Sequence, residues 1–192
     1  MPCMKKLLVF LVLIATVSLS ACSGNSTEDP NKCEDVSAAD FITFLGVKYG
    51  MVETKLDEVL GQSSGGEYVS DSSQFIFYFN WVDRVPLSIW TNGENTLVQT
   101  IFIEILSYEE KFENDKQAVI DKFDLDPCDL RFMGMTADEI IAIMGDPDEK
   151  RDLEEGVSQI SYDTKDYSCN VCFKFYESQG NICSSIRVTW FY

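Results

Sequence analysis

Two stretches of the chain share one pattern of apolar and polar positions. Residues 50–61 and 134–145 each open with Gly-Met and close with glycine, and the second lies 84 positions after the first (134 − 50). The pattern predicts a short amphipathic helix in each stretch, which needs an apolar surface to pack against. In both, the apolar residues recur at the spacing of one helix face: Met51, Leu56, Val59 and Leu60, then Met135, Ile140, Ile143 and Met144.

The second stretch also carries signals for both ends of its helix. Thr136 followed by Glu139 has the Ser/Thr-x-x-Glu form of a capping box, which marks a helix N-terminus. Gly145 stands where a residue with left-handed backbone often follows a helix, as Gly61 does in the first stretch.

Beyond each helix the hydrophobic period changes from helical to alternating. Three strand-like runs follow the first helix, around 75–81, 87–90 and 97–105, with an Asn-Gly hairpin signal at 92–93. Runs around 160–162, 171–175 and 182–190 follow the second helix, and matching positions differ by 84 or 85 (160 − 75 = 85). This constant offset indicates an internal duplication.

A further helix is expected at the start of each copy, over residues 37–45 and 107–123. The predicted fold class is therefore α+β: two tandem helix–helix–three-stranded antiparallel sheet modules, at 37–106 and 107–192.

The N-terminus has the form of an export signal. Lys5 and Lys6 precede an apolar run that is short for a membrane span, and Leu19-Ser20-Ala21-Cys22 follows. This segment resembles the lipobox of bacterial lipoproteins, in which the cysteine is lipidated and becomes the first mature residue. Residues 1–21 are then a signal peptide and 22–36 a polar, lipidated tether; the alternative is an ordinary signal peptide cleaved near Ala21.

Acyl chains on Cys22 would anchor the protein to a membrane without spanning it. By the Gram-negative sorting convention, Ser23 after the cysteine favours the outer membrane, with the folded part either periplasmic or exposed on the cell surface. We therefore expect an outer membrane lipoprotein in a Gram-negative cell envelope.

Charge and composition exclude several classes of function. The formal net charge is −17, and removal of Lys5 and Lys6 with the signal peptide makes it −19. A surface this negative repels nucleic acid and anionic lipid headgroups. The chain contains no histidine, which excludes Ser-His-Asp and Cys-His catalysis and imidazole metal sites. We expect neither a cofactor nor a metal.

The cysteines leave more than one interpretation open. Cys169 and Cys172 have the spacing of a redox or zinc pair, but they fall in a strand-like run, where positions three apart point to opposite faces. Disulfides or buried thiols are therefore favoured over a redox site or zinc. In an oxidising envelope, two bridges and one leftover thiol are possible, and the pairing stays open among Cys33, Cys128, Cys169, Cys172 and Cys183.

Strand alternation also suggests a contact surface. Phe75, Phe77 and Phe79 are expected to face the core, which turns Ile76 and Tyr78 to the other face of the sheet. Apolar side chains on an otherwise open sheet face indicate a binding surface.

The repeated unit, with its Gly-Met-Thr opening and Met-Gly-Asp-Pro end at residues 134–147, resembles two groups of bacterial envelope proteins. One is the SmpA/OmlA (BamE-like) lipoprotein domain, and the other is the beta-lactamase-inhibitor-protein fold. This resemblance implies non-catalytic protein binding.

We therefore expect a membrane-anchored scaffold or binding module, not an enzyme, with another envelope protein as partner. The alternatives are a thiol-dependent redox protein using Cys169 and Cys172, and a surface lipoprotein that binds carbohydrate through exposed aromatic side chains.

Overall fold

The computed structural model describes residues 33, 36–70, 74–82, 85–92, 97–107, 109–123, 125–154 and 156–191. The folded unit is Cys33–Tyr192. The predicted signal peptide, the lipidation site Cys22 and residues 23–32 of the tether lie outside the described residues. The lipid anchor therefore stays a prediction.

Strands dominate the described chain. The first part contains η1 (Ala38–Ile42), β1 (Thr43–Phe44), β2 (Val47–Lys48), α2 (Glu53–Leu60), β3 (Gly65–Val69), β4 (Gln74–Val82), β5 (Val85–Asn92) and β6 (Leu97–Glu104). The second part contains α3 (Glu109–Phe123), η2 (Pro127–Leu130), α4 (Ala137–Met144), β7 (Glu149–Glu154), β8 (Val157–Asp163), β9 (Cys169–Tyr176), η3 (Glu177–Gln179) and β10 (Cys183–Trp190). The elements labelled η are short 3-10 helices.

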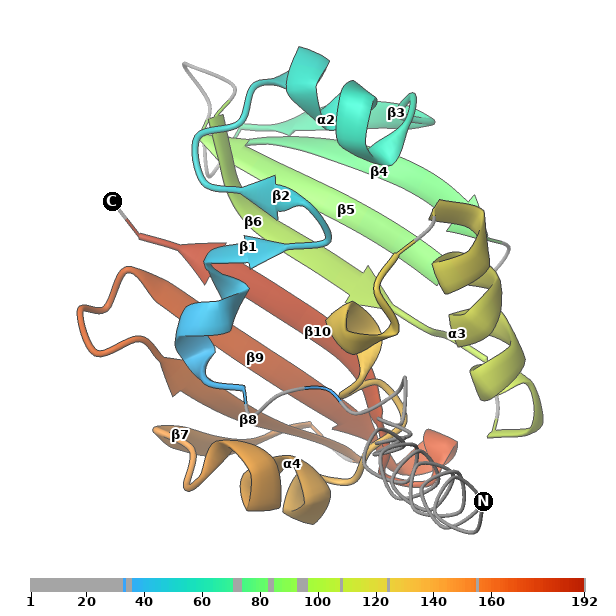
Figure 1. The fold of residues 1–192 in the computed structure, drawn as a ribbon, viewed down its shortest axis with the longest axis vertical. Coiled ribbons are helices and arrows are strands. Elements are labelled where there is room, and N and C mark those ends of the chain that lie inside the picture. The colour runs from blue at the N-terminus through green and yellow to red at the C-terminus, as the bar shows by residue number, and fades with distance from the viewer. Residues whose placement is uncertain are drawn as a thin grey trace, which may run out of the picture. The chain divides into compact units, whose positions relative to one another are not determined.

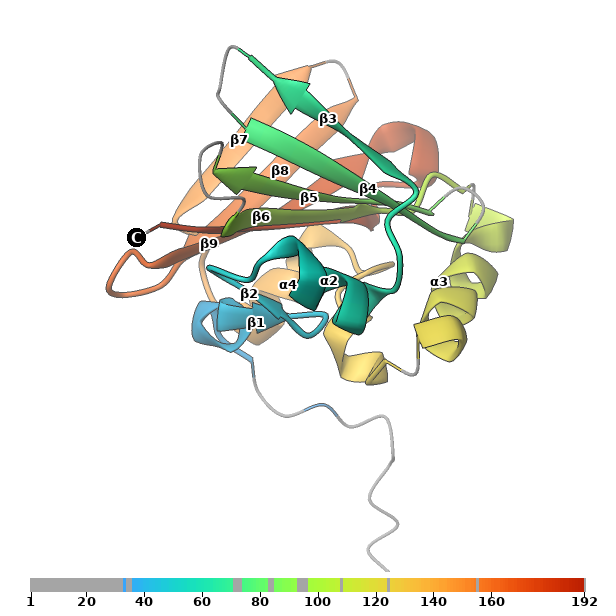
Figure 2. The same cartoon turned by 90° about the horizontal axis from the view of Figure 1, so that it is seen from above.

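Eight of the strands form one antiparallel sheet in the order β3-β4-β5-β6-β10-β9-β8-β7. The α-helices and the small β1–β2 hairpin cover one face of this sheet (Figures 1 and 2). None of the α-helices in the described chain lies on the other face, which we call the open face.

The elements recur at the offset seen in the sequence. Helix α4 lies 84 positions after α2 at both ends (137 − 53 and 144 − 60), and each is followed by four antiparallel strands. The two sets of strands meet where β6 pairs with β10. At the centre of that pairing Phe102 lies opposite Arg187, its own equivalent at offset 85 (187 − 102).

The predicted α+β class with two tandem helix–helix–three-stranded modules is wrong. The fold is mainly β, with a single eight-stranded sheet and one hydrophobic core. A separate sheet in each half would leave the outer edges of β6 and β10 as rows of unpaired backbone groups. Pairing these two strands satisfies both edges and joins their apolar faces, since Ile101 lies opposite Val188 and Ile103 opposite Ile186.

Two strands and one helix differ from the sequence prediction for local reasons. All six residues of β7 are exposed, and β3 begins with two glycines, so neither strand has an alternating apolar pattern. The helix expected at 37–45 is only a five-residue 3-10 helix before β1. The helix expected at 107–123 is present as α3.

The repeated helices pack through only part of the apolar face that their spacing predicts, because Val59 and Ile143 remain exposed. Leu56 and Leu60 of α2 and Ile140 of α4 are buried. The capping box of α4 is confirmed: the Thr136 hydroxyl accepts a hydrogen bond from the Glu139 backbone, and the Thr136 backbone N–H donates to the Glu139 carboxylate at 2.8 Å. Gly61 and Gly145 follow the helices with φ of 76° and 85°, a region that favours glycine.

Candidate functional site

The open face of the sheet holds the two residues singled out from strand alternation. Phe77 and Phe79 face the helices and are buried, so Ile76 and Tyr78 of β4 face the other way. Tyr78 keeps 38% of its surface exposed, whereas Ile76 keeps only 6%. Ile76 lies between Glu67 and Trp90 on the neighbouring strands, which bury it. Tyr78 is therefore the one of the two that is accessible to a partner.

Two further side chains complete this surface. Trp90 of β5 lies opposite Ile76 and is 37% exposed, and the half-buried Phe102 of β6 lies opposite Ser88, the cross-strand partner of Tyr78. We call Ile76, Tyr78, Trp90 and Phe102 the aromatic patch. Sequence reasoning assigned no role to Trp90 and Phe102, although their alternation with Ile89 and Ile101 already places them on the open face.

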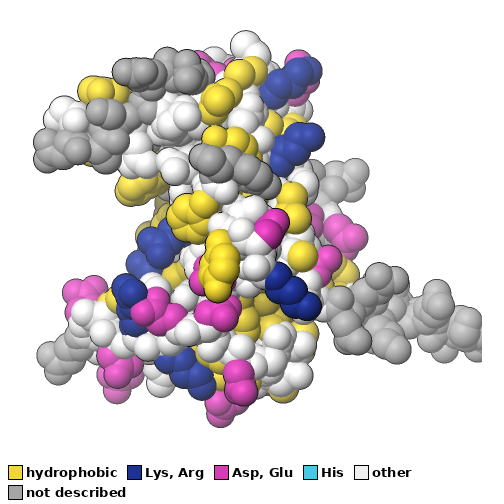
Figure 3. Space-filling model, turned by 90° about the vertical axis from the view of Figure 1, so that its left-hand side faces the viewer, with side chains coloured by type: hydrophobic (Ala, Val, Ile, Leu, Met, Phe, Trp, Pro, Cys, Tyr) yellow, Lys and Arg dark blue, Asp and Glu magenta, His cyan; other side chains and the backbone are white. Residues whose placement is uncertain are grey.

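Hydrogen bonds hold parts of the aromatic patch in place. The Tyr78 hydroxyl donates to the Glu67 carboxylate at 2.5 Å, and this bond raises the pKa of Tyr78. The indole N–H of Trp90 donates to the Ser88 hydroxyl at 3.3 Å. In the side view of Figure 3, the molecule is indented at mid-height on the side away from the helices, and hydrophobic side chains lie at the level of this indentation.

The other half of the open face is polar. Lys174 of β9 and Arg187 of β10 lie there, and the Tyr176 hydroxyl donates to the Glu104 carboxylate at 2.5 Å across the centre of the sheet. Burial, then that hydrogen bond, raise the pKa of Tyr176. The open face therefore has an aromatic half and a charged half.

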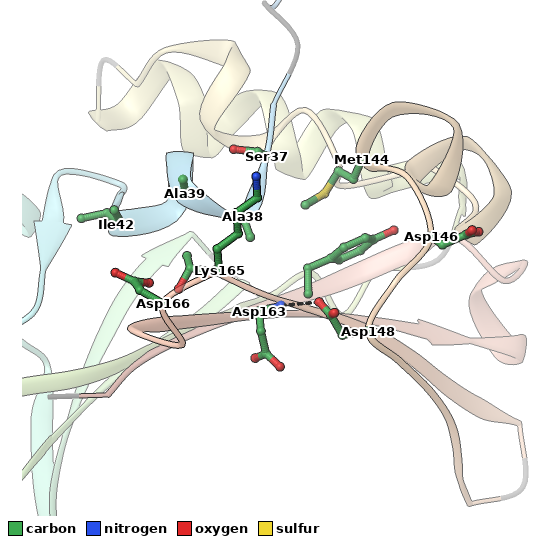
Figure 4. Close-up of a pocket in the computed structure, with 12 residues that line it drawn as sticks. Ser37, Ala38, Ala39, Ile42, Met144, Asp146, Asp148, Asp163, Lys165 and Asp166 are labelled. Carbon is green, nitrogen blue, oxygen red and sulfur yellow. Dashed lines mark hydrogen bonds between the residues drawn. The ribbon is translucent and has the colours of Figure 1, made fainter.

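A cleft of about 660 Å³ lies on the helix-covered side, where η1, the end of α4 and the end of β8 converge (Figure 4). Its apolar lining comes from Ala38, Ala39, Ile42, Met144 and the ring of Tyr162. The polar part of the lining is Ser37, Asp146, Asp148, Asp163, Thr164, Lys165 and Asp166. The Asp163 carboxylate points away from the cleft (Figure 4).

Neutral donors hold several of these carboxylates. Asp148 accepts a hydrogen bond from the Asp163 backbone at 2.7 Å. Bonds from Thr164 and Ser168 lower the pKa of Asp166 to about 2. Burial, with the negative charges of Asp146 and Asp148, raises the pKa of Tyr162 to about 12, and its hydroxyl donates to the Gly145 carbonyl at 3.0 Å.

The cysteines form one bridge among the described residues. Cys33 and Cys128 are joined, with their Cα atoms 5.6 Å apart, while Cys169, Cys172 and Cys183 are free and fully buried. The two bridges that the cysteine count allowed are thus reduced to one, which links the start of the folded unit to η2.

The buried thiols have the wrong properties for a redox pair. Cys169 lies on the helix side, where its thiol contacts the Phe41 carbonyl at 3.9 Å, and Cys172 lies on the open-face side of the same strand. Burial raises the pKa of Cys169 to about 12 and also raises that of Cys172. Because the thiolate is the reactive form, such thiols are poor nucleophiles at neutral pH.

The described chain has neither a cluster of metal ligands nor a membrane-spanning helix. No group of three or more cysteine or acidic side chains there converges as metal ligands, and no helix there is long and apolar enough to cross a membrane.

Comparison with protein families finds no match, and comparison with curated sequences finds none either. Weak likenesses to solved structures exist. A DUF4309 family protein (YjgB) of Bacillus subtilis is 8% identical, with 73% of this chain and 78% of that one covered and a TM-score of 0.46. A cysteine-rich secretory protein of Staphylococcus aureus is 10% identical, with 73% and 44% covered and a TM-score of 0.42.

An extracellular protein of Bacillus anthracis that contains an SCP domain is 11% identical, with 83% of this chain and 47% of that one covered and a TM-score of 0.43. The chain thus spans less than half the length of the last two proteins. Likenesses this distant carry no argument about what the protein does.

The expected resemblance to BamE-like and beta-lactamase-inhibitor-protein-like modules is wrong. The chain forms one eight-stranded sheet where tandem three-stranded modules were expected, and the solved structures found are of other kinds. The Gly-Met motif on which the resemblance rested specifies a short capped helix, and such a helix can precede many sheets.

Proposed function

We propose that this protein is a non-catalytic binding module that acts outside the cytoplasm and presents the open face of its sheet to another protein. The observation that carries this proposal is the aromatic patch, with Tyr78 and Trp90 exposed at diagonal positions of β4 and β5, on a face that no α-helix of the described chain covers. Tyrosine and tryptophan are enriched at protein interfaces, where they supply much of the binding energy.

The disulfide supports a location outside the cytoplasm. A bridge such as Cys33–Cys128 persists in oxidising compartments and is rare in the cytosol. The lipobox-like segment ending at Cys22 adds a finer proposal, namely anchoring of the tether to the outer membrane of a Gram-negative cell by acyl chains.

Metabolic labelling with a fatty acid tests the anchor. Wild-type protein should take up the label and sediment with membranes, and a Cys22→Ala variant should do neither. A labelled, membrane-bound Cys22→Ala variant would contradict the anchor while leaving the binding proposal untouched.

Site-specific photo-cross-linking tests the binding face. A benzophenone amino acid placed at Tyr78 or Trp90 should yield the same cross-linked partner protein in intact cells. The matched control places it at Asp57, which is exposed on α2 and therefore on the covered side of the sheet. Equal adducts from Asp57, or no adduct from Tyr78 and Trp90, would contradict the proposal.

The same two aromatic side chains favour carbohydrate as a second candidate. Exposed rings beside hydroxyl and carboxylate groups, here Ser88 and Glu67, are also able to stack on sugars. Retention on immobilised cell-surface polysaccharide that is lost in Trp90→Ala, without a protein adduct, would favour this candidate. The buried, high-pKa thiols of Cys169 and Cys172 count against the redox alternative.

A further inference from the structure

The cleft beside Tyr162 is a second surface, separate from the open face. Figure 4 shows its lining side chains arriving from η1, from the end of α4 and from the segment around Asp163. Its volume of about 660 Å³ is within the range of ligand sites in proteins. Ala38 and Met144 give it an apolar wall, and Tyr162 contributes a ring whose hydroxyl is already bonded.

The charge in this cleft is not neutralised from within the described chain. Among the described lining residues, the carboxylates of Asp146, Asp148 and Asp166 outnumber the one cation, Lys165, and none of these four forms an ion pair with another described residue. Asp148 and Asp166 accept hydrogen bonds from neutral donors, namely backbone N–H groups and the Ser168 hydroxyl. No cation of the described chain is therefore paired with these carboxylates.

The shape of the cleft distinguishes between kinds of cation. Since no three ligands converge on one point among the described residues, a bare metal ion is a poor fit. An apolar wall beside carboxylates instead matches a side chain with an aliphatic stem and a charged head. Lysine and arginine have this form, and they bury the stem while the head stays among polar groups.

We propose that this cleft binds a lysine or arginine side chain from a basic, extended segment of a partner protein. The charged head lies beside the carboxylates of Asp146 and Asp148, and the stem lies against Ala38, Met144 and Tyr162. Because this surface lies on the helix-covered side of the sheet, the proposal does not depend on binding at the aromatic patch.

Fluorescence anisotropy with a labelled peptide of alternating lysine and alanine tests this proposal, on the full chain purified in detergent at low salt. The peptide should bind, and its acetyl-lysine version, which keeps the stem but lacks the charge, should not. Asp146→Asn should weaken binding about threefold to fivefold, as expected for one partly exposed ion pair. Asp146→Lys should weaken it more than tenfold, because like charges then meet.

Two matched variants make the test specific. Asp57→Asn makes the same charge change on α2, outside the cleft, and should leave the affinity unchanged. Ala38→Trp fills the cleft without changing charge and should abolish binding. Equal weakening by Asp57→Asn and Asp146→Asn would overturn the proposal, because binding would then depend only on net charge.

Two further results would also overturn the proposal. One is equal binding of the acetyl-lysine peptide. The other is displacement of the lysine peptide by calcium at concentrations where magnesium has no effect, which would identify a metal site. Circular dichroism and melting curves of each variant establish that a loss of binding is not a loss of fold.

Discussion

The two halves of the sheet have the same order of elements. Their side chains are alike in character on the helix-covered face and differ on the open face. At equivalent positions, the helix-covered face is apolar in both halves: Phe77 matches Tyr162, Ile89 matches Phe173 and Ile101 matches Ile186. The open face is not. Its aromatic patch in the first half is replaced in the second by polar and charged residues, at offsets of 84 or 85: Ser161, Asp163, Lys174 and Arg187.

This difference separates folding from binding. The buried face must stay apolar in both halves, because its side chains form the single core. The open face has no such constraint, so a change from aromatic to charged residues there alters the surface without altering the fold. The cleft shows the same divergence, because Asp146 and Asp148 have Gln62 and Ser64 at the equivalent positions of the first half.

The largest expected effect is on the buried face. Phe173 is fully buried, and its ring centroid lies 5.2 Å from that of Phe132 and 6.1 Å from those of Phe41 and Tyr162. Phe173→Ala should lower the free energy of unfolding by about 3–5 kcal/mol, measured by urea denaturation. Ile89→Ala, its counterpart in the first half, should cost about 2–5 kcal/mol. A loss below about 1 kcal/mol at either site would contradict the shared core.

The next largest effect is expected from the Cys33–Cys128 disulfide. Unlike the helices and strands, this bridge is not repeated in the two halves of the described chain. It closes a sequence separation of 95 residues, so it restricts the unfolded chain strongly. Replacing Cys33 and Cys128 by serine should lower the free energy of unfolding by about 2–4 kcal/mol. In the presence of a reductant, the wild-type protein should have the same free energy of unfolding as the variant. If the reductant also destabilised the variant, the stabilisation could not be assigned to this disulfide.

A smaller effect distinguishes the two repeated helices. Thr136 caps α4 with its side chain, whereas Val52 at the same place before α2 makes no such bond. Thr136→Ala should destabilise the protein by about 1 kcal/mol, and Val52→Thr should stabilise it by a similar or smaller amount. Melting temperatures of both variants provide the check, and a destabilising Val52→Thr would show that the two helix starts are not equivalent.

The smallest expected effect is that the buried thiols of the folded protein do not react with a thiol reagent. Among the described residues, burial raises the pKa of the free thiols of Cys169, Cys172 and Cys183, and that of Cys169 reaches about 12, so each stays protonated at pH 8 in the folded protein. A thiol reagent should modify Cys169, Cys172 and Cys183 only after unfolding in denaturant, as measured by mass spectrometry. Rapid labelling of the native protein at any of them would reopen the redox alternative.

Part of this fold could be predicted from the sequence. Helices α2 and α4 lie within the repeated stretches 50–61 and 134–145, because a helical apolar period and closing glycines specify them locally. Strand β7 could not be predicted, since it has no buried residue. The pairing of β6 with β10 could not be predicted from the sequence either, because an apolar strand such as β6 has the same pattern whichever strand lies beside it.

The candidate sites could also be predicted only in part from the sequence. Alternation along β4 places Tyr78 on the open face, and the same rule applied to β5 and β6 reaches Trp90 and Phe102. The burial of Ile76 depends on neighbouring strands, so its own strand does not reveal it. The cleft brings together Ala38 and Tyr162 from opposite ends of the folded unit, and no local pattern signals that meeting.

Exchanging residues between the halves tests most directly whether the aromatic patch binds rather than stabilises. Trp90→Lys and Phe102→Arg place on the first half the residues that the second half already carries. The double variant should keep the circular dichroism spectrum and melt within a few degrees of wild type, yet lose the adduct that forms from a benzophenone amino acid at Tyr78. An undiminished adduct, or a double variant that no longer folds, would contradict the account.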